Sequence, residues 1–353
     1  MRKKQDWVVR DKLVFVGLED AKRTWKLCVR SEGMVVHETS LPAEYANLHQ
    51  YLTRRYPGCR IRVMYEAGFS GFGLHDRLVA DGIGCVVTPP HTVTQEKVQG
   101  VKTDRVDARR LARNLESGDY AACHVPDRER REDRQLVRTL SQIQRDVVRT
   151  KNRIRKFLDF HGLNAGLPVG AWCRSDYARL EAMSLSGPLR QSLTVWLRQL
   201  ATLEDLKREL VAALKVVASK ARYRQAVASK QRCAGVGWLS AIRFTLEWGD
   251  LSRFPTGKQI ASFVGLTSRE HSSGEVVHRG RITGQGNAQV RAWLIQCAWR
   301  ALRRDPVLLA KYQRVWRNAG SKKKAIVAVA RTLAVRMRAV ELANEPYTPG
   351  VIR

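Results

Sequence analysis

The chain has 353 residues, of which 63 are lysine or arginine and 33 are aspartate or glutamate, so its formal net charge is +30. Its hydrophobic content of 44% excludes an intrinsically disordered protein, and its length is sufficient for two or three domains with cores of their own. A compact monomer with this charge repels itself unless a polyanion neutralises it, so nucleic acid is the expected partner, with an anionic membrane surface or a ribosomal or histone-like structural role as the alternatives.

Residues 12–125 alternate between strand and helix patterns, as expected of an α/β domain in which a sheet packs against helices. Strands are predicted, in chain order, at residues 13–18, 24–29, 59–68 and 83–90, and the first two read as a hairpin. Helices are predicted at residues 44–56, at 71–82, and from the capping residue Thr103 to about Glu116.

Residues 126–225 have the pattern of two long charged helices, each with a narrow apolar stripe. The apolar residues of the first helix recur at positions 136, 140, 143, 147, 154 and 158. A loop from Gly162 to Gly170 separates it from the second helix, whose stripe comprises Leu197, Leu200, Leu203, Leu210, Leu214 and Val217. We expect an antiparallel coiled-coil-like pair or a dimerising arm, and an ordinary helical bundle is the alternative.

Residues 226–353 form a third, mainly helical region. Gly235 and Gly237 lie between two helical patterns, and this turn resembles a helix-hairpin-helix turn whose backbone amides would face a phosphate, although a plain helix turn is equally compatible. Residues 265–287 are polar and glycine-rich and are expected to form a loop. The last helix begins with three cations that oppose its dipole, so we expect them to bind a phosphate: Lys322, Lys323 and Lys324. Most of the tryptophans are expected in the core rather than stacked on bases.

Two carboxylates in an arginine-rich helix stand out in the first region. Asp104 and Asp107 are three residues apart, which places both on one helix face with Cβ atoms about 5–6 Å apart. Acids at a helix N-terminus also serve simply as caps. Glu66 and Glu19, however, end two predicted strands, and carboxylates at strand ends beside a helix-borne pair indicate a two-metal nuclease. Mg²⁺ prefers carboxylate oxygen and leaves positions open for phosphate oxygens.

Targeting and redox signals point to the cytosol. No apolar run approaches the roughly 20 residues of a membrane span, and no apolar signal-peptide core follows the basic N-terminus. We therefore expect no membrane partner. The seven cysteines are scattered without a CxxC pair, which favours reduced thiols over disulfides or a structural zinc site.

Several strings resemble one family of insertion-sequence transposases, the IS-one-ten or DEDD family. In the first half these are VGLEDAK (16–22), YEAGFSG (65–71) and KTDRVDARRLAR (102–113). The block 235–274 and the string RGRITGQGN (279–287) resemble the second half of the family in the same order. The resemblance implies a RuvC-like, RNase H-fold metal-binding domain at 1–125, a helical or coiled-coil region at 126–225, and a C-terminal transposase domain at 226–353.

The resemblance also implies four metal-binding acids, which by position are Glu19, Glu66, Asp104 and Asp107. They would hold Mg²⁺ or Mn²⁺. The family usually has aspartate at the first position, where this chain has glutamate. Asp20 is the alternative ligand, although in a strand it would point to the face opposite Glu19.

The family uses a serine that bonds DNA covalently, and its position here is Ser273, with Ser272 as the alternative. A serine that attacks a phosphodiester needs cations around the transferring phosphoryl group. The chain supplies arginines on both sides of this serine: Arg269, Arg279 and Arg281.

The expected partners are DNA, both the target and the element ends, and further copies of the chain in a dimer or dimer of dimers. The expected location is the bacterial cytosol or nucleoid. The sequence holds no zinc finger, basic zipper or RNP motif that would read a DNA site. The resemblance implies that a non-coding bridge RNA supplies the specificity instead. The alternatives are a metal-dependent endonuclease of the Holliday-junction-resolvase type and a non-enzymatic nucleic-acid-binding protein.

Overall fold

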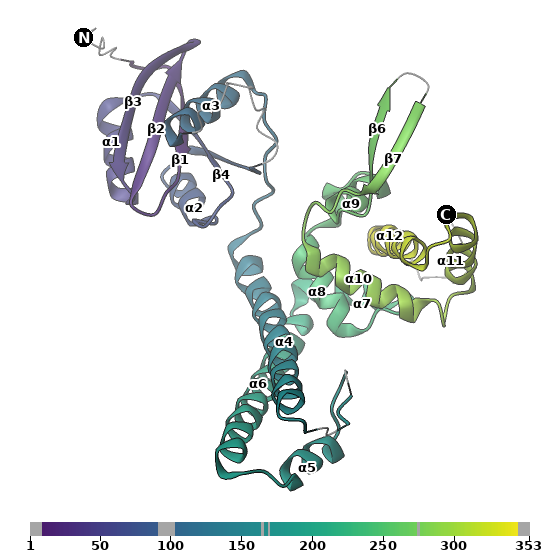
Figure 1. Ribbon diagram of the computed structural model, residues 1–353. Coiled ribbons are helices and arrows are strands. Elements are labelled where there is room, and N and C mark those ends of the chain that lie inside the picture. Colours follow the sequence, from purple (N-terminus) through teal and green to yellow (C-terminus); the bar gives the residue numbers. More distant parts are fainter. Residues whose placement is uncertain (1–8, 91–102, 164–165, 169, 274–275, 345–353) are drawn as a thin grey trace. The chain divides into compact units, whose positions relative to one another are not determined.

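The computed structural model describes residues 9–90, 103–163, 166–168, 170–273 and 276–344 (Figure 1). The chain divides into two compact units, Met1–Val125 and Pro126–Arg353. Within the described residues, no helix is both long enough and apolar enough to cross a membrane.

The first unit contains a mixed five-stranded sheet with the order β3-β2-β1-β4-β5. Its strands are β1 (Leu13–Glu19), β2 (Thr24–Ser31), β3 (Met34–Pro42), β4 (Arg60–Glu66) and β5 (Gly84–Thr88). Strand β2 is antiparallel to both of its neighbours, whereas β1, β4 and β5 are parallel. The four expected strands are confirmed. Strand β3 was not predicted, because most of its residues are exposed or half-buried and show no alternation of apolar and polar positions.

Helices cover both faces of this sheet. The buried side chains of Val14, Val16 and Leu18 pack in one core with residues of α1 (Tyr45–Arg55) and α2 (Gly73–Ala80). The odd-numbered positions of β1 face the other side, where α3 (Asp104–Ser117) packs, because side chains alternate along a strand.

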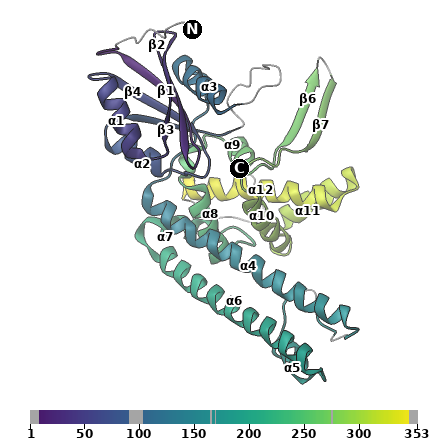
Figure 2. The same cartoon turned by 60° about the vertical axis from the view of Figure 1, so that its left-hand side comes forward.

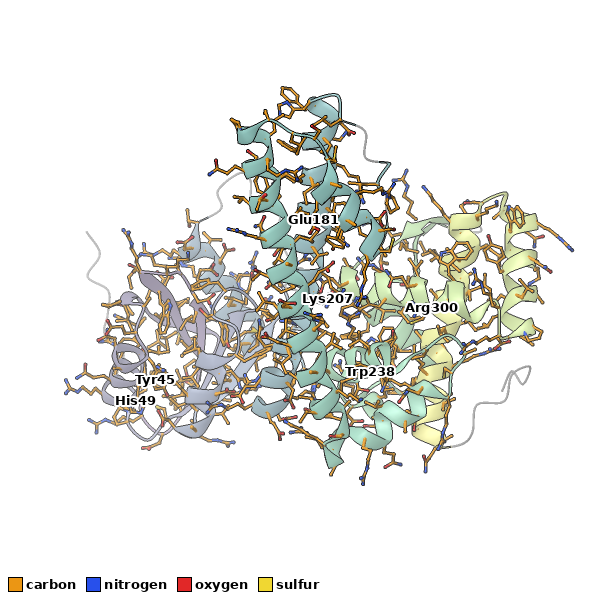
Figure 3. The ribbon with its side chains drawn as sticks, turned by 90° about the horizontal axis from the view of Figure 1, so that it is seen from below. Tyr45, His49, Glu181, Lys207, Trp238 and Arg300 are labelled. Atoms are coloured by element: carbon orange, nitrogen blue, oxygen red, sulfur yellow. The ribbon has the colours of Figure 1, made fainter. Side chains whose placement is uncertain are left out.

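Helix α1 is tied to the end of α2. The hydroxyl of Tyr45 donates a hydrogen bond of 2.5 Å to Asp81 Oδ2, and the rings of Tyr45 and His49, labelled in Figure 3, lie 6.0 Å apart on α1. Thr103 precedes α3 as expected, but its side chain makes no capping hydrogen bond.

The second unit begins with two 33-residue helices, α4 (Arg128–Phe160) and α6 (Gly187–Ser219), joined through the short helix α5 (Arg174–Ala182). Ion pairs of Lys151 with Glu204 (3.2 Å) and of Asp133 with Lys220 (2.9 Å) show that α4 and α6 run antiparallel. Both views of the ribbon show them side by side, with α5 at the far end (Figure 2). The expected pair of long helices is therefore confirmed, whereas α5 was not anticipated.

The rest of this unit is mainly helical, with one core. In chain order its elements are α7 (Ala221–Gln231), α8 (Trp238–Trp248), a 3₁₀ turn (Leu251–Arg253), α9 (Gly257–Phe263), β6 (Ser268–Ser273), β7 (Val276–Ile282), α10 (Ala288–Ala301), α11 (Pro306–Ala319) and α12 (Lys322–Ala343). Trp248 and Trp293 are buried in this core, and Phe244 stacks on Trp248 with ring centroids 4.7 Å apart.

The expectation of a loop at 265–287 is wrong. Strands β6 and β7 pair there as an antiparallel hairpin, in which Ser273 is opposite Val276 and Ser272 is opposite Val277. Polar, glycine-rich residues lack the alternation that identifies a half-buried strand, so backbone pairing builds a hairpin that the sequence pattern does not reveal.

Candidate active site

Helix α3 approaches β1 closely at a glycine. A Cβ atom on Gly17 would overlap the carbonyl oxygen of Ala108 and the amide nitrogen of Ala112, and would lie 2.9 Å from Leu111 Cβ. Ala108 and Ala112 are buried together with Cys28 of β2, so the contact consists of small side chains. Glycine is therefore required for α3 to lie directly on the sheet.

Glu19 and Glu66 end neighbouring strands. Strands β1 and β4 are parallel and pair Leu18 with Tyr65, so the next residue of each strand is a glutamate at the same edge of the sheet. Gly17 and Glu19 share a face because side chains alternate along the strand. Glu19 is thus on the side of the sheet that α3 covers.

Arg110 of α3 connects two of the predicted acids. Its Nη2 atom lies 3.0 Å from Glu66 Oε1 and 3.0 Å from Asp107 Oδ1, so these two carboxylate oxygens lie within twice that distance of each other. Asp107 is buried, whereas Asp104 is exposed in the first turn of α3. The Nε atom of Arg110 is also buried and has no hydrogen-bond partner among the described residues.

The negative charges of the neighbouring acids act on Glu19. Its pKa is raised to about 7, first by burial and then by the negative charges of Glu66, Asp107, Asp20 and Asp104. The structure therefore brings together the four acids singled out in the sequence, from two strands and one helix. We call Glu19, Asp20, Glu66, Asp104 and Asp107 the acid cluster.

Asp20 differs from Glu19 in its surroundings. Burial raises the pKa of Asp20, and a hydrogen bond with the Ser70 side chain partly offsets that effect. Its Oδ2 atom is buried and has no hydrogen-bond partner within the described ranges. An unsatisfied buried carboxylate oxygen calls for a donor or a cation at this position.

The acid cluster fits a divalent cation in donor chemistry and in charge. Carboxylate oxygens are the ligands that Mg²⁺ and Mn²⁺ take, and a cation would relieve the repulsion that raises the pKa of Glu19. In the part of the chain that the structure describes, however, no three His, Cys, Asp or Glu side chains are arranged to hold a metal ion. The guanidinium of Arg110 lies between Glu66 and Asp107 instead, so binding there requires Arg110 to move.

The predicted nucleophile belongs to the second unit. Ser273 is the last residue of β6, Ser272 precedes it, and Gly274 lies outside the described residues, as do Val101 and Lys102 before α3. Arg279 is opposite Glu270 in the hairpin. The side chains of Arg269 and Arg281 are exposed, and Arg269 Nη2 lies 3.4 Å from the carbonyl oxygen of Thr283.

The two glycines of the predicted phosphate-binding turn have different surroundings. Gly235 has φ +78°, and a Cβ there would overlap the carbonyl oxygen of Cys297 and lie 2.6 Å from the Ala301 nitrogen, so packing against α10 accounts for this glycine. Gly237 is exposed at the N-cap of α8, with open space where a Cβ would be. Only Gly237 therefore offers a free approach to a ligand.

The three lysines occupy the exposed first turn of α12, as predicted. Ser321 caps the helix by accepting a hydrogen bond from the Lys324 amide. Lys322 Nζ lies 5.0 Å from the centre of the Trp316 ring, a cation–π contact that gives this lysine a partner within the chain.

The close contact at Gly17 and the bridge from Arg110 to Glu66 were not anticipated. Gly17 has a detectable signal, because a glycine inside the buried strand 13–19 indicates that another backbone approaches closely. Arg110 follows Asp107 by three residues, which predicts the pair between them but not the contact with Glu66, 44 residues earlier.

Comparison with known proteins gives matches over most of the chain. A family model described as "Transposase IS116/IS110/IS902 family" matches residues 231–313, and a DEDD transposase model matches residues 16–162. The proposed transposase y4rJ of Sinorhizobium fredii is 30% identical, with 92% of this chain and 90% of that protein covered. The transposase for insertion sequence element IS1111A of Coxiella burnetii is 25% identical, with 95% and 91% covered. The pilin gene-inverting protein of Moraxella bovis is 30% identical over 32% of this chain and 36% of its own length.

Proposed function

The chain belongs to the IS116/IS110/IS902 family of transposases, which are DNA strand-transfer enzymes, and we propose that it cuts and rejoins DNA through a covalent bond to Ser273. The DEDD domain makes its catalysis metal-dependent. We propose Mg²⁺ or Mn²⁺ as the ion, with Glu19, Glu66, Asp104 and Asp107 as the residues that hold it.

One observation carries this proposal: the pKa of Glu19 is raised to about 7, first by its burial and then by the negative charges of carboxylates from β1, β4 and α3. In a protein of net charge +30 that acts on phosphates, such acids weaken substrate attraction unless they bind a cation. The sheet order 3-2-1-4-5 with α3 against one face is consistent with a RuvC-like, RNase H-type domain.

The chemistry divides between the acid cluster and the serine. Glu19, Glu66, Asp104 and Asp107 would hold the divalent ion, which would supply charge neutralisation at the phosphate. The Oγ atom of Ser273 loses its proton and bonds to phosphorus, while a deoxyribose oxygen leaves and takes up a proton. A hydroxyl group of another strand then displaces the serine, and Ser273 regains its proton. Because each step breaks one phosphorus–oxygen ester bond and forms another, rejoining needs no ATP.

The test is the Ser273→Ala variant, with Ser272→Ala as the matched control on the same strand. Labelled DNA carrying the element ends is incubated with each protein and resolved on a denaturing gel. We expect the covalent protein–DNA species and the recombinant product to disappear for Ser273→Ala and to persist for Ser272→Ala. Full DNA cleavage by Ser273→Ala without an adduct would instead support the alternative, a Holliday-junction-type endonuclease.

We further propose that a non-coding bridge RNA selects the DNA sites and that the protein acts as a dimer or dimer of dimers. The chain has no recognisable module that reads DNA sequence, and α4 and α6 present a long paired surface for self-association. A folded RNA is expected to copurify with the protein. Undiminished recombination after complete RNase treatment of a reconstituted reaction would contradict the proposed bridge RNA. A monomer in analytical ultracentrifugation would contradict the proposed dimer or dimer of dimers.

A further inference from the structure

The C-terminal helices carry almost no negative charge. Residues 276–340 contain fifteen lysines and arginines but one acid, Asp305. Asp305 is buried, caps α11 by accepting from the Val307 amide (2.9 Å), and pairs with Arg336 at 2.6 Å. Asp305 is therefore engaged inside the fold, and Glu341 near the end of α12 pairs with the buried Lys230, so the surface that α10, α11 and α12 present is cationic.

Two large aromatic side chains are exposed on the same helices. Trp299 of α10 is 46% exposed and Trp316 of α11 is 40% exposed, whereas Trp248 and Trp293 are buried in the core. Tyr312 lies between the exposed pair, with ring centroids 5.6 Å from Trp299 and 6.1 Å from Trp316. We call Trp299, Tyr312 and Trp316 the aromatic patch. The general expectation that tryptophans pack in the core does not hold for its two tryptophans.

Cations lie beside this patch. Lys322 Nζ is 5.0 Å from the Trp316 ring, and Arg300, labelled in Figure 3, directly follows Trp299. On α11, burial and then the positive charges of Arg314, Arg331 and Arg336 lower the pKa of Lys311. The part of this shift that comes from neighbouring cations reflects a local excess of positive charge, which an anionic phosphate would offset.

We propose that Trp299 and Trp316 stack on bases of an unpaired DNA strand while the surrounding lysines and arginines bind its phosphates. Exposed aromatic rings among cations are the arrangement by which proteins hold single strands, since every base offers a π face and the backbone offers charge. In a duplex those faces are covered by neighbouring bases. Strand transfer necessarily separates DNA strands, so the proposal rests on the family's strand-transfer activity and not on the identity of the nucleophile.

The test measures binding of fluorescent oligonucleotides to the full-length protein in EDTA, where cleavage does not interfere. The variants are Trp299→Ala and Trp316→Ala, with Trp299→Phe and Trp316→Phe as the conservative controls. We expect each alanine variant to weaken binding of single-stranded oligothymidine by about tenfold, and each phenylalanine variant to retain most of the affinity. Binding of a duplex of equal length should change by less than about twofold, because it depends mainly on phosphate contacts.

Two further measurements keep the outcome decisive. Melting curves verify that each variant is folded, and in the wild-type protein oligothymidine should protect tryptophan fluorescence from acrylamide quenching. Equal weakening of single-stranded and duplex DNA, or unchanged binding of both, would overturn the proposal. Tryptophan-dependent binding of oligouridine but not oligothymidine would also overturn it and would identify RNA as the occupant. If the tryptophan variants bind as expected but no covalent Ser273–DNA adduct forms, the proposed nucleophile is refuted and the single-strand-binding proposal stands.

Discussion

Replacing Arg110 with glutamine tests whether this side chain occupies the place of the metal ion. Its Nη2 atom lies 3.0 Å from both Glu66 and Asp107, and the side chains are 22%, 21% and 10% exposed. An exposed ion pair contributes about 0–1 kcal/mol, and breaking a buried pair costs about 3–5 kcal/mol. For these largely buried carboxylates we expect Arg110→Gln to lower the free energy of unfolding of the metal-free protein by about 2 kcal/mol.

The affinity for a divalent metal ion should rise in Arg110→Gln, although the stability of the metal-free protein falls. In the wild-type protein an ion that binds Glu66 and Asp107 must first displace Arg110, and this cost disappears in the glutamine variant. If the lost contacts contribute about 1.4 kcal/mol to that cost, Mn²⁺ affinity rises about tenfold. Urea unfolding with and without Mg²⁺ measures the stability, and electron paramagnetic resonance of free Mn²⁺ measures the affinity.

Arg109→Gln is the matched control. Arg109 is the neighbouring residue on α3, and it hydrogen-bonds to Glu38, which is not a member of the acid cluster. This variant should lose stability without any change in its response to metal. A metal response of Arg110→Gln no larger than that of Arg109→Gln, or an unchanged stability in the absence of metal, would refute the reasoning.

Three other outcomes follow from the geometry. Gly17→Ala should lower the free energy of unfolding by about 3 kcal/mol and weaken Mn²⁺ binding, because the added methyl group displaces α3. Wild-type stability and wild-type Mn²⁺ affinity in this variant would exclude the close contact between β1 and α3. The pKa of Glu19 is about 7 in the folded protein and 4.5 for the free side chain, so the stability of the metal-free protein should fall as pH rises between these values. Urea unfolding of Glu19→Gln should show no such fall. The control variant Glu44→Gln, which changes an exposed glutamate, should retain it. Because Glu19 is half-buried, solvent screening should limit the gain of Glu19→Gln at about pH 8 to about 1–2 kcal/mol. Gly235→Ala should lower the melting temperature by several degrees through its positive φ and its overlap with α10, and an unchanged melting curve would show that the turn adapts.

Local patterns in the sequence were sufficient to predict most elements, because each depends on a few neighbouring residues. The apolar stripes of α4 and α6 recur with helical spacing, and four of the five sheet strands are apolar or alternating runs. Strand β3 and the β6–β7 hairpin lack such a pattern in their sequences, and their backbone pairing with neighbouring strands defines them instead. The charge of +30 and the family motifs likewise came from the sequence alone.

The acid cluster required the tertiary structure. That Glu19 lies beside Glu66 follows from the parallel pairing of β1 with β4, whose residues are 47 positions apart, and α3 lies on the face of Glu19 because Gly17 admits its backbone. The bridge from Arg110 to Glu66 depends on both contacts. Long-range pairing and helix packing are set by the burial of whole faces, which no short stretch of sequence encodes, and these contacts determine which charges repel one another and where a cation can bind.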